Sequence, residues 1–268
     1  MLISEFLDVS IIMTKIIAVA NQKGGVGKTT TAVNFAAGLG VSEIKTLLID
    51  MDPQANATQG CGVTFENKNT IYEVLIENKK VDKAITDTDI PYLDVIPANP
   101  QLVGAEIEMV SEIGREYILK KRLRKLEADY DYIIIDCPPS LGLLTVNSLT
   151  TANSVLIPIQ CEYYAMEGLG QLLNTIRRVQ KSLNEDLEVE GVLLTMYDAR
   201  LRLSDEVADQ VKEHFQDKLF NTKIRRNVRL GESPSHGQPI ILYDASSRGA
   251  QDYMDFVGEF LGKNDEQK

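Results

Sequence analysis

The chain has 268 residues, 44% of them hydrophobic, and a formal net charge of −11 at neutral pH. A chain of this length can bury one sizeable core, so we expect one domain. The acidic balance argues against a protein that nucleic acid coats over its whole surface, although a local basic patch stays open. Cys61, Cys137 and Cys161 are widely spaced and form no C-x-x-C pair, which fits reduced thiols in a cytoplasm better than disulfides or a metal cluster.

Both ends of the chain are expected to lie outside the folded domain. Glu5 and Asp8 make the first residues acidic, and no basic leader precedes them, which argues against a signal peptide. Met13-Thr14-Lys15 is typical of a natural start for the fold expected here. The expected division is an N-terminal extension (1–12), one folded domain (13–262) and a disordered tail (263–268).

Short β-branched runs alternate with longer helical patterns along the chain. This alternation predicts an α/β fold with a single doubly wound, mostly parallel sheet and helices on both faces. No apolar run approaches the roughly 18 residues of a membrane span. We expect strands at 15–20, 46–50, 93–98, 132–137, 154–159, 189–196 and 221–224, and helices at 28–39, 70–78, 103–126, 141–151, 166–183, 203–218 and 246–262.

A glycine-rich segment follows the first predicted strand. Residues 23–30 read Lys-Gly-Gly-Val-Gly-Lys-Thr-Thr and fit the phosphate-loop pattern G-x-x-x-x-G-K-[ST] in a shortened form. The glycines let consecutive backbone N–H groups turn toward phosphate oxygens, and the following helix adds its positive end. A mere turn is the plainer interpretation, but this order of residues between strand and helix favours a nucleotide site. The expected contacts are Lys23, Gly24, Gly25, Val26, Gly27, Lys28, Thr29 and Thr30.

The loop carries two lysines with different expected roles. Lys28 can neutralise charge on the β- and γ-phosphates, and the Thr29 hydroxyl can ligate Mg²⁺. Lys23 is not needed for that cradle. It is therefore either a solvated surface lysine or a group that reaches a second nucleotide across a dimer interface, as an arginine finger does.

Two further strands end in carboxylates that would complete the site. Asp52 follows the strand at 46–50, and Asp136 ends the strand at 132–136. Because the carboxyl ends of parallel strands meet at one edge of a sheet, both should lie near the loop. Asp136 is suited to hold the Mg²⁺ shell through water, and Asp52, stiffened by Pro53, to orient the attacking water. Either aspartate alone could be a cap or a turn residue; together with the loop they predict a nucleotide hydrolase.

Three motifs carry a resemblance to a known family. Lys23–Thr30, Asp50–Asn56 and Asp136–Gly142 resemble the deviant Walker A, A′ and B motifs of ParA/MinD-type ATPases. The resemblance is closest to the chromosomal ParA (Soj) branch and runs from about Thr14 to about Phe260. Segments similar to that branch are Leu93–Ala98, Ile159–Gly168, Leu194–Arg200 and Arg226–Gly237.

The resemblance implies ligands, partners and a role. It implies a deviant Walker P-loop ATPase that binds ATP and Mg²⁺, forms a homodimer when ATP is bound, and binds double-stranded DNA without sequence preference. It implies chromosome or plasmid partitioning with a ParB-like centromere-binding protein that accelerates hydrolysis, and a cytoplasmic, nucleoid-associated location. Lys23, Lys28, Asp52 and Asp136 would be catalytic, with Thr29 and Asp136 at the metal.

The same resemblance extends the nucleotide site beyond the loop. Glu162 would either touch the ribose across the dimer interface or cap a helix. Met196, Arg225 and Asn227 would line the adenine site. Arg225 is a departure, because the family often has a proline at this position.

Basic residues gather in the C-terminal third of the chain. Solvated helix faces are their plainest interpretation, but the resemblance favours a DNA surface. Without interleaved aromatic residues, the contacts should go to the phosphate backbone. Arg200, Arg226 and Arg229 are the candidates, and the wider group adds Arg177, Arg178, Lys181, Arg202, Lys223 and Arg225.

Rival functions belong to other classes of protein. A MinD-like membrane-associated ATPase needs a basic amphipathic C-terminal helix, whereas residues 252–261 are acidic. A nitrogenase-type electron carrier needs paired cysteines around an iron–sulfur cluster, and a metabolic ligase of related fold fits the long ParA resemblance poorly. We therefore expect no membrane partner.

Overall fold

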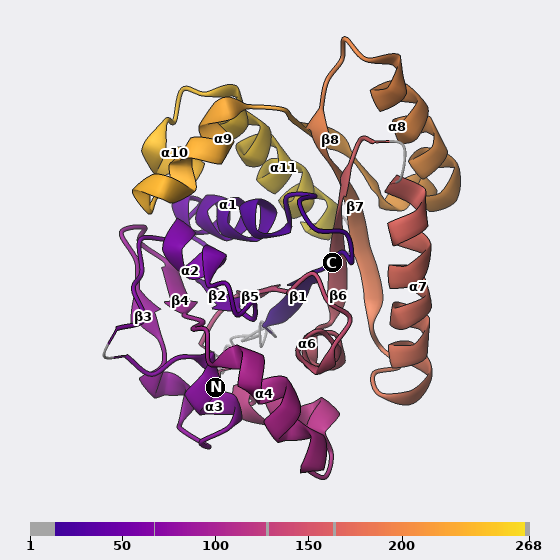
Figure 1. Ribbon diagram of the computed structural model, residues 1–268. Helices are drawn as coiled ribbons and strands as arrows, with labels where there is room; N and C mark the ends of the chain where they lie inside the picture. Colours follow the sequence, from indigo (N-terminus) through magenta and orange to yellow (C-terminus); the bar gives the residue numbers. More distant parts are fainter. Residues whose placement is uncertain (1–13, 67, 127–128, 163–164, 266–268) are drawn as a thin grey trace, which may run out of the picture.

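The computed structural model describes residues 14–66, 68–126, 129–162 and 165–265. These residues form an eight-stranded sheet with the strand order β3-β4-β2-β5-β1-β6-β7-β8 (Figure 1). All neighbouring strands run parallel except β3 and β4. The strands are β1 (Lys15–Val19), β2 (Thr46–Asp50), β3 (Thr86–Asp87), β4 (Leu93–Ile96), β5 (Tyr132–Asp136), β6 (Ser154–Gln160), β7 (Glu188–Tyr197) and β8 (Leu219–Arg225).

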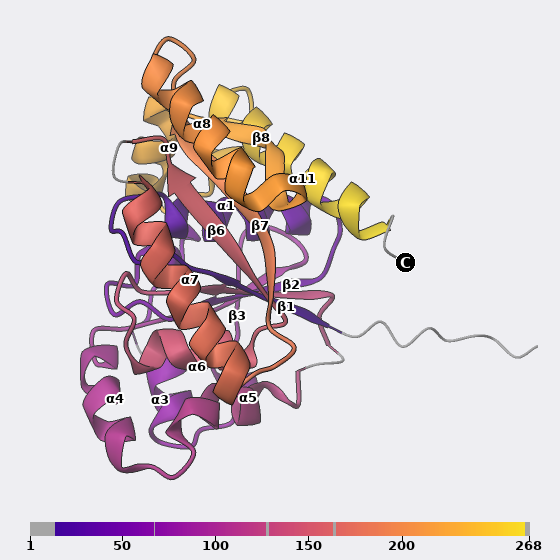
Figure 2. The same ribbon diagram turned by 90° about the vertical axis from the view of Figure 1, so that its right-hand side faces the viewer.

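Helices cover both faces of the sheet (Figures 1 and 2). One face packs against α1 (Lys28–Val41), α2 (Asn56–Gly60), α9 (Val228–Glu232), α10 (Ile240–Tyr243) and α11 (Arg248–Asp265). The other packs against α3 (Ile71–Leu75), α4 (Leu102–Glu108), α5 (Ile118–Leu123), α6 (Leu143–Thr151), α7 (Ala165–Ser182) and α8 (Arg202–Phe215). This arrangement confirms the predicted doubly wound α/β fold.

The central strands are buried on both sides, as parallel strands between helix layers must be. In β1 and β5, every residue after the first is buried. On the α1 face, the ring of Phe35 packs 5.0 Å from that of Phe256 and 4.9 Å from that of Phe260, measured between centroids. These contacts fasten α11 to α1, so the two helices lie side by side in both views.

The edge strand β8 is capped by a side chain from α11. The carboxylate of Glu259 accepts the backbone N–H of Asn221 at 2.7 Å and that of Thr222 at 2.8 Å. The Thr222 hydroxyl donates to the same carboxylate at 2.7 Å. Part of the exposed hydrogen-bonding edge is therefore already satisfied within the chain.

The long helix expected at 103–126 is wrong, because the chain breaks there. Gly114 adopts a φ of +69°, a left-handed conformation that interrupts an α-helix. Short 3₁₀ turns, Met109–Ser111 and Arg115–Tyr117, fill the space between α4 and α5. Other 3₁₀ turns lie at Val81–Lys83, Gln216–Lys218 and Ser233–His236.

The C-terminal boundary also differs from its prediction. Helix α11 continues to Asp265, so the tail expected to be disordered from residue 263 begins as helix. Residues 266–268 and the predicted extension 1–12 lie outside the described residues. None of the described helices combines the length and the apolar character needed to cross a bilayer.

Candidate functional site

The candidate site lies where the parallel strands end. In the sheet register, Asp136 is opposite both Val19 and Asp50, so the ends of β5, β1 and β2 coincide. The glycine-rich segment connects the end of β1 to α1. The structure thus brings the predicted loop and both predicted strand-end carboxylates to one edge, as the parallel topology requires.

The loop conformation depends on two glycines. Gly25 has a φ of +73° and Gly27 a φ of +84°, a region that other residues adopt only with strain. A Cβ at Gly24 or Gly25 would meet no other atom within 4 Å, so that part of the loop is open. The Thr195 hydroxyl donates to the carbonyl of Val26 at 2.8 Å and ties the loop to β7.

Lys28 is the first residue of α1 and is 7% exposed. Its Nζ donates to the carbonyl of Lys23 at 3.2 Å, across the loop. Burial lowers the pKa of Lys28, and the nearby carboxylates of Asp136 and Asp52 partly offset that effect. Within the described part of the chain this ammonium group donates one hydrogen bond, so it has donors left for an anion, which suits a phosphate group.

Asp136 is a buried carboxylate at the end of β5. Its side chain is fully buried, and neither carboxylate oxygen has a hydrogen-bond partner among the described residues. Burial, followed by the charge of Asp50, raises the pKa of Asp136, and the neighbouring Thr29 hydroxyl offsets part of that rise. A buried carboxylate without partners beside a hydroxyl has the chemistry of a Mg²⁺ site.

No group of three His, Cys, Asp or Glu side chains that could hold a metal by itself occurs in the described ranges. A Mg²⁺ ion here would depend on phosphate oxygens and water for its remaining ligands. This is the usual manner of Mg²⁺ in nucleotide sites. The residues therefore fit Mg²⁺ together with a nucleotide better than Mg²⁺ alone.

The segment after β2 is held by Asp50. Its carboxylate accepts the backbone N–H and the hydroxyl of Thr58, both at 2.8 Å, and the N–H of Asp52 at 3.0 Å. Burial raises the pKa of Asp50 to about 6, against the opposing effect of these hydrogen bonds. Asp52 is 8% exposed and accepts the N–H of Gln54 at 2.9 Å. Asp50 thus has a structural role, and Asp52 is the carboxylate of this segment that could act on a ligand beside Asp136.

Lys23 and Glu162 are paired within one chain. The Lys23 Nζ donates to Glu162 at 3.3 Å, and the Arg226 guanidinium lies 4.0 Å from the same carboxylate. Asn21 accepts the Lys23 N–H at 3.0 Å, and Gln160 donates to Glu162 at 2.5 Å. The side chains of Lys23 and Glu162, the two residues predicted to act across a dimer interface, are 31% and 47% exposed at the mouth of the loop.

A cavity of about 190 Å³ lies beside the loop. Met196, which has a φ of +50°, Arg225 and Asn227 contribute to its wall together with Gly27 and Thr30. The structure therefore brings the three residues predicted for adenine next to the loop. The remaining lining residues are Thr195, Ile224, Arg226, Leu230, Gly231 and Tyr253.

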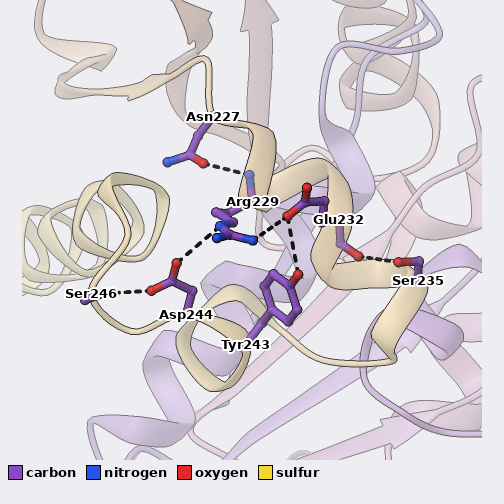
Figure 3. Close-up of polar contacts among 7 residues, drawn as sticks. All are labelled: Asn227, Arg229, Glu232, Ser235, Tyr243, Asp244 and Ser246. Atoms are coloured by element: carbon purple, nitrogen blue, oxygen red, sulfur yellow. Dashed lines mark hydrogen bonds and ion pairs between the residues drawn. The ribbon is translucent and has the colours of Figure 1, made fainter.

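The predicted DNA-contacting arginines are exposed, but they already have partners. Arg200 donates to Asp198 through Nε at 2.9 Å and through its terminal nitrogen at 2.6 Å, and this pairing lowers the pKa of Asp198 to about 2. Arg229 donates to Glu232 at 2.9 Å and lies 3.5 Å from Asp244 (Figure 3).

Asn227 and Tyr243 belong to the same local network. Asn227 caps α9 by accepting the N–H of Arg229 at 2.8 Å, and the Tyr243 hydroxyl donates to Glu232 at 3.3 Å (Figure 3). The Asn227 side chain is thus occupied by a structural hydrogen bond. Its contribution to the cavity would come from its other atoms.

Sequence reasoning missed several residues of this site. Asn21, Thr195 and Tyr253 each act through one side-chain hydrogen bond to the loop or to α1. Asn21 stands between a strand and the loop, a position that could have drawn notice. Thr195 lies in the family-like segment Leu194–Arg200, next to the predicted Met196, but nothing local marks its contact with the loop or that of Tyr253 with α1, because the partners are more than 160 residues away.

Comparison with known proteins places the chain in a family. The profile of the AAA domain family matches residues 14–189. The sporulation initiation inhibitor protein Soj of Bacillus subtilis (strain 168) is 58% identical over 248 residues, which cover 92% of this chain and 98% of that protein. The chromosome partitioning protein ParA of Myxococcus xanthus (strain DK1622) is 52% identical over 255 residues, covering 95% of this chain and 90% of that protein.

A solved structure adds a nucleotide to the comparison. Cobyrinic acid a,c-diamide synthase from Mycobacterium smegmatis, with a bound ATP analogue and magnesium, superposes with a TM-score of 0.83 and 38% identity. The match covers 95% of this chain and 97% of that one. The extent and the level of these matches confirm the resemblance seen in the motifs. The chain belongs to the ParA/Soj family of deviant Walker ATPases.

Proposed function

We propose that this ATPase is a nucleotide-driven association switch that works in chromosome or plasmid partitioning. The observation that carries the proposal is the fully buried Asp136 carboxylate, which has no hydrogen-bond partner among the described residues and lies at the end of β5 beside the loop. A buried carboxylate in this state is costly unless a ligand satisfies it. ATP with Mg²⁺ is the ligand that this carboxylate, Lys28 and the open loop fit together.

Each residue of the site has a part in that proposal. The loop N–H groups and Lys28 bind the phosphates, while Thr29 and Asp136 hold the Mg²⁺. When bound, the metal would offset the negative charges of the phosphates and of the nearby carboxylate. Asp52 orients the attacking water, and the cavity beside Met196 receives the adenine.

Association follows from residues at the mouth of the loop. Lys23 and Glu162 leave their intrachain pair when two ATP-bound subunits close face to face, and Lys23 then reaches the partner's phosphates. Each lysine adds positive charge where negative charge builds up during hydrolysis. Loss of the γ-phosphate removes these contacts and releases the dimer.

The dimer is proposed to bind double-stranded DNA without sequence preference. Arg200, Arg226 and Arg229 would contact the phosphate backbone from both subunits, and a ParB-like centromere-binding protein would accelerate hydrolysis. The Myxococcus xanthus relative is named a chromosome partitioning protein, which supports the partitioning role that this DNA binding would serve. The proposal places the protein in the cytoplasm, on the nucleoid.

Sedimentation with nonspecific duplex DNA tests the switch. We expect DNA binding with ATP and Mg²⁺, and little with ADP or without nucleotide. Equal binding in all three states would overturn the proposal that nucleotide controls DNA affinity.

The membrane-associated alternative meets a structural obstacle. Tyr253, Phe256, Val257 and Phe260 of α11 are buried against the sheet, so the apolar face of the C-terminal helix is already used. A lipid-binding helix needs that face free. We expect no ATP-dependent pelleting with anionic vesicles, and such pelleting would favour the alternative.

A further inference from the structure

Helix α11 contacts both walls of the cavity through two consecutive residues. Asp252 pairs with Arg225 at the end of β8, and Tyr253 lines the cavity itself. The Tyr253 hydroxyl lies 3.1 Å from the hydroxyl of Thr31 on α1, the helix that starts at the phosphate loop. One turn of α11 thus touches the loop helix on one side and the segment at the end of β8 on the other.

The pair between Arg225 and Asp252 joins both main chain and side chain. The Arg225 backbone N–H donates to Asp252 at 2.9 Å, and its Nε lies 3.0 Å and 3.1 Å from the two carboxylate oxygens. A terminal guanidinium nitrogen adds a further hydrogen bond. The side chain of Asp252 is 4% exposed, whereas that of Arg225 is 40% exposed. A buried carboxylate with several donors from one residue holds that residue's backbone firmly.

A proline at position 225 could not make this contact, because it has no backbone N–H. Proline would fix the backbone by its ring, whereas Arg225 is held from outside by a side chain of α11. The restraint matters for the cavity because Arg225, Arg226 and Asn227 follow one another along its wall. In this chain the shape of that wall therefore depends on an ion pair.

We propose that Asp252 is a positioning residue for the nucleotide base, because it fixes the wall at Arg225 relative to the phosphate loop. The inference rests on the proposed function, since it takes adenine as the occupant of the cavity. Asp252 acts on the base and not on the phosphates, because its contacts reach the end of β8 and not the glycine loop. Base affinity and phosphate affinity should consequently respond differently to its loss.

Calorimetric titration of Asp252→Asn with MgATP and with magnesium tripolyphosphate, which has no base, tests the inference. We expect ATP affinity to fall by about tenfold, while tripolyphosphate affinity stays within about twofold of the unmodified protein. Selectivity for ATP over GTP should fall as well. Asp217→Asn is the matched control, because it makes the same change at an exposed position next to the opposite end of β8.

A second variant covers the case in which Asp252→Asn does not fold. Arg225→Lys keeps the backbone N–H and the positive charge but loses the forked guanidinium, and we expect about a threefold loss in ATP affinity alone. Equal losses for ATP and tripolyphosphate, or an unchanged ATP affinity in both variants, would overturn the inference. If the unmodified protein binds ATP no more tightly than tripolyphosphate, the proposed adenine site is wrong, and the role of Asp252 is overturned with it.

Discussion

The strand-end site and the basic C-terminal third differ in how their charged side chains are partnered. At the strand ends, Lys28 and Asp136 are buried. The Asp136 carboxylate has no hydrogen-bond partner among the described residues, and the Lys28 ammonium donates to the Lys23 carbonyl and can donate further N–H groups to an anion. In the C-terminal third, Arg200 and Arg229 are exposed and each already donates to a carboxylate. A ligand at the strand ends would give the buried Asp136 carboxylate the partners that it lacks and so would lower the free energy of the site. DNA at the C-terminal third would have to displace the carboxylates that already pair with the arginines. Nucleotide binding should therefore be strong, and each DNA contact weak and sensitive to salt.

Replacing Lys28 is expected to have the largest effect. Lys28→Ala removes the buried ammonium group from the phosphate site, so ATP affinity should fall by at least about 100-fold in calorimetric titration. Lys23→Ala should leave ATP affinity within about threefold, because Lys23 is half-exposed and pairs with Glu162. It should instead abolish the ATP-dependent dimer in light scattering and reduce turnover.

The same two lysine variants can also contradict the role proposed for Lys23. Equal losses of ATP affinity in both variants would mean that Lys23 serves the nucleotide of its own subunit. Lys80→Ala provides a control for the loss of a lysine charge, because Lys80 is exposed and remote from the loop in sequence.

Asp52 sharpens the division of work inside the strand-end site. Asp52→Ala should reduce turnover by at least about 100-fold and change ATP affinity little, because water is no longer oriented while the phosphate cradle stays intact. Asp52→Asn can still accept the N–H of Gln54, so it separates loop geometry from the carboxylate charge. Normal hydrolysis by both variants would exclude Asp52 from this role.

We expect the buried Asp136 carboxylate to lower the stability of the protein when no nucleotide is bound. Because burial raises its pKa, the nucleotide-free protein must either protonate this carboxyl or bury its charge. Asp136→Asn should raise the melting temperature of the nucleotide-free protein by roughly 2–6 °C. MgATP should then stabilise the unmodified protein and leave the variant nearly unchanged.

The pH dependence has a definite sign. Asp50 has a raised pKa of about 6, so the folded protein holds more protons than the unfolded chain in mild acid. The contribution of Asp50 to the stability of the nucleotide-free protein should consequently fall as the pH rises from about 4 to 6, and the Asp136 contribution acts in the same direction, whereas the lowered pKa of Glu259 acts in the opposite direction. Thermal melts of the unmodified protein and of Asp50→Asn across that range check it, and a difference between them that does not change with pH would contradict the origin assigned to the Asp50 shift.

Replacing Arg200 is expected to have the smallest effect, and it tests the basic C-terminal third. Arg200→Ala should weaken binding to all DNA sequences alike and lower the slope of log K against log salt by roughly 0.9, with basal ATPase activity unchanged. Asp198→Asn should strengthen DNA binding, because it frees Arg200 from its carboxylate partner. Unchanged DNA binding in both variants would remove Arg200 from the surface.

The sequence predicted the strand-end site better than the rest because its signals are local. Residues 23–30 lie together in the chain, and a strand that ends in Asp136 can be recognised alone. The sequence does not predict the break at Gly114, because apolar residues recur at helical spacing on both sides of it. Arg225 and Asp252 are 27 residues apart in the chain, so neither the amino-acid composition nor the hydrophobic periodicity predicts that they pair.

The capped edge strand limits the ways in which copies of this protein can assemble. The Glu259 carboxylate occupies the N–H groups of Asn221 and Thr222, so a strand from another molecule cannot take those hydrogen bonds. Sheets that grow by adding strands at their edges lead to open-ended fibres. Protection of these two N–H groups discourages such growth at this part of β8, so assembly of copies through this stretch of the sheet edge is disfavoured.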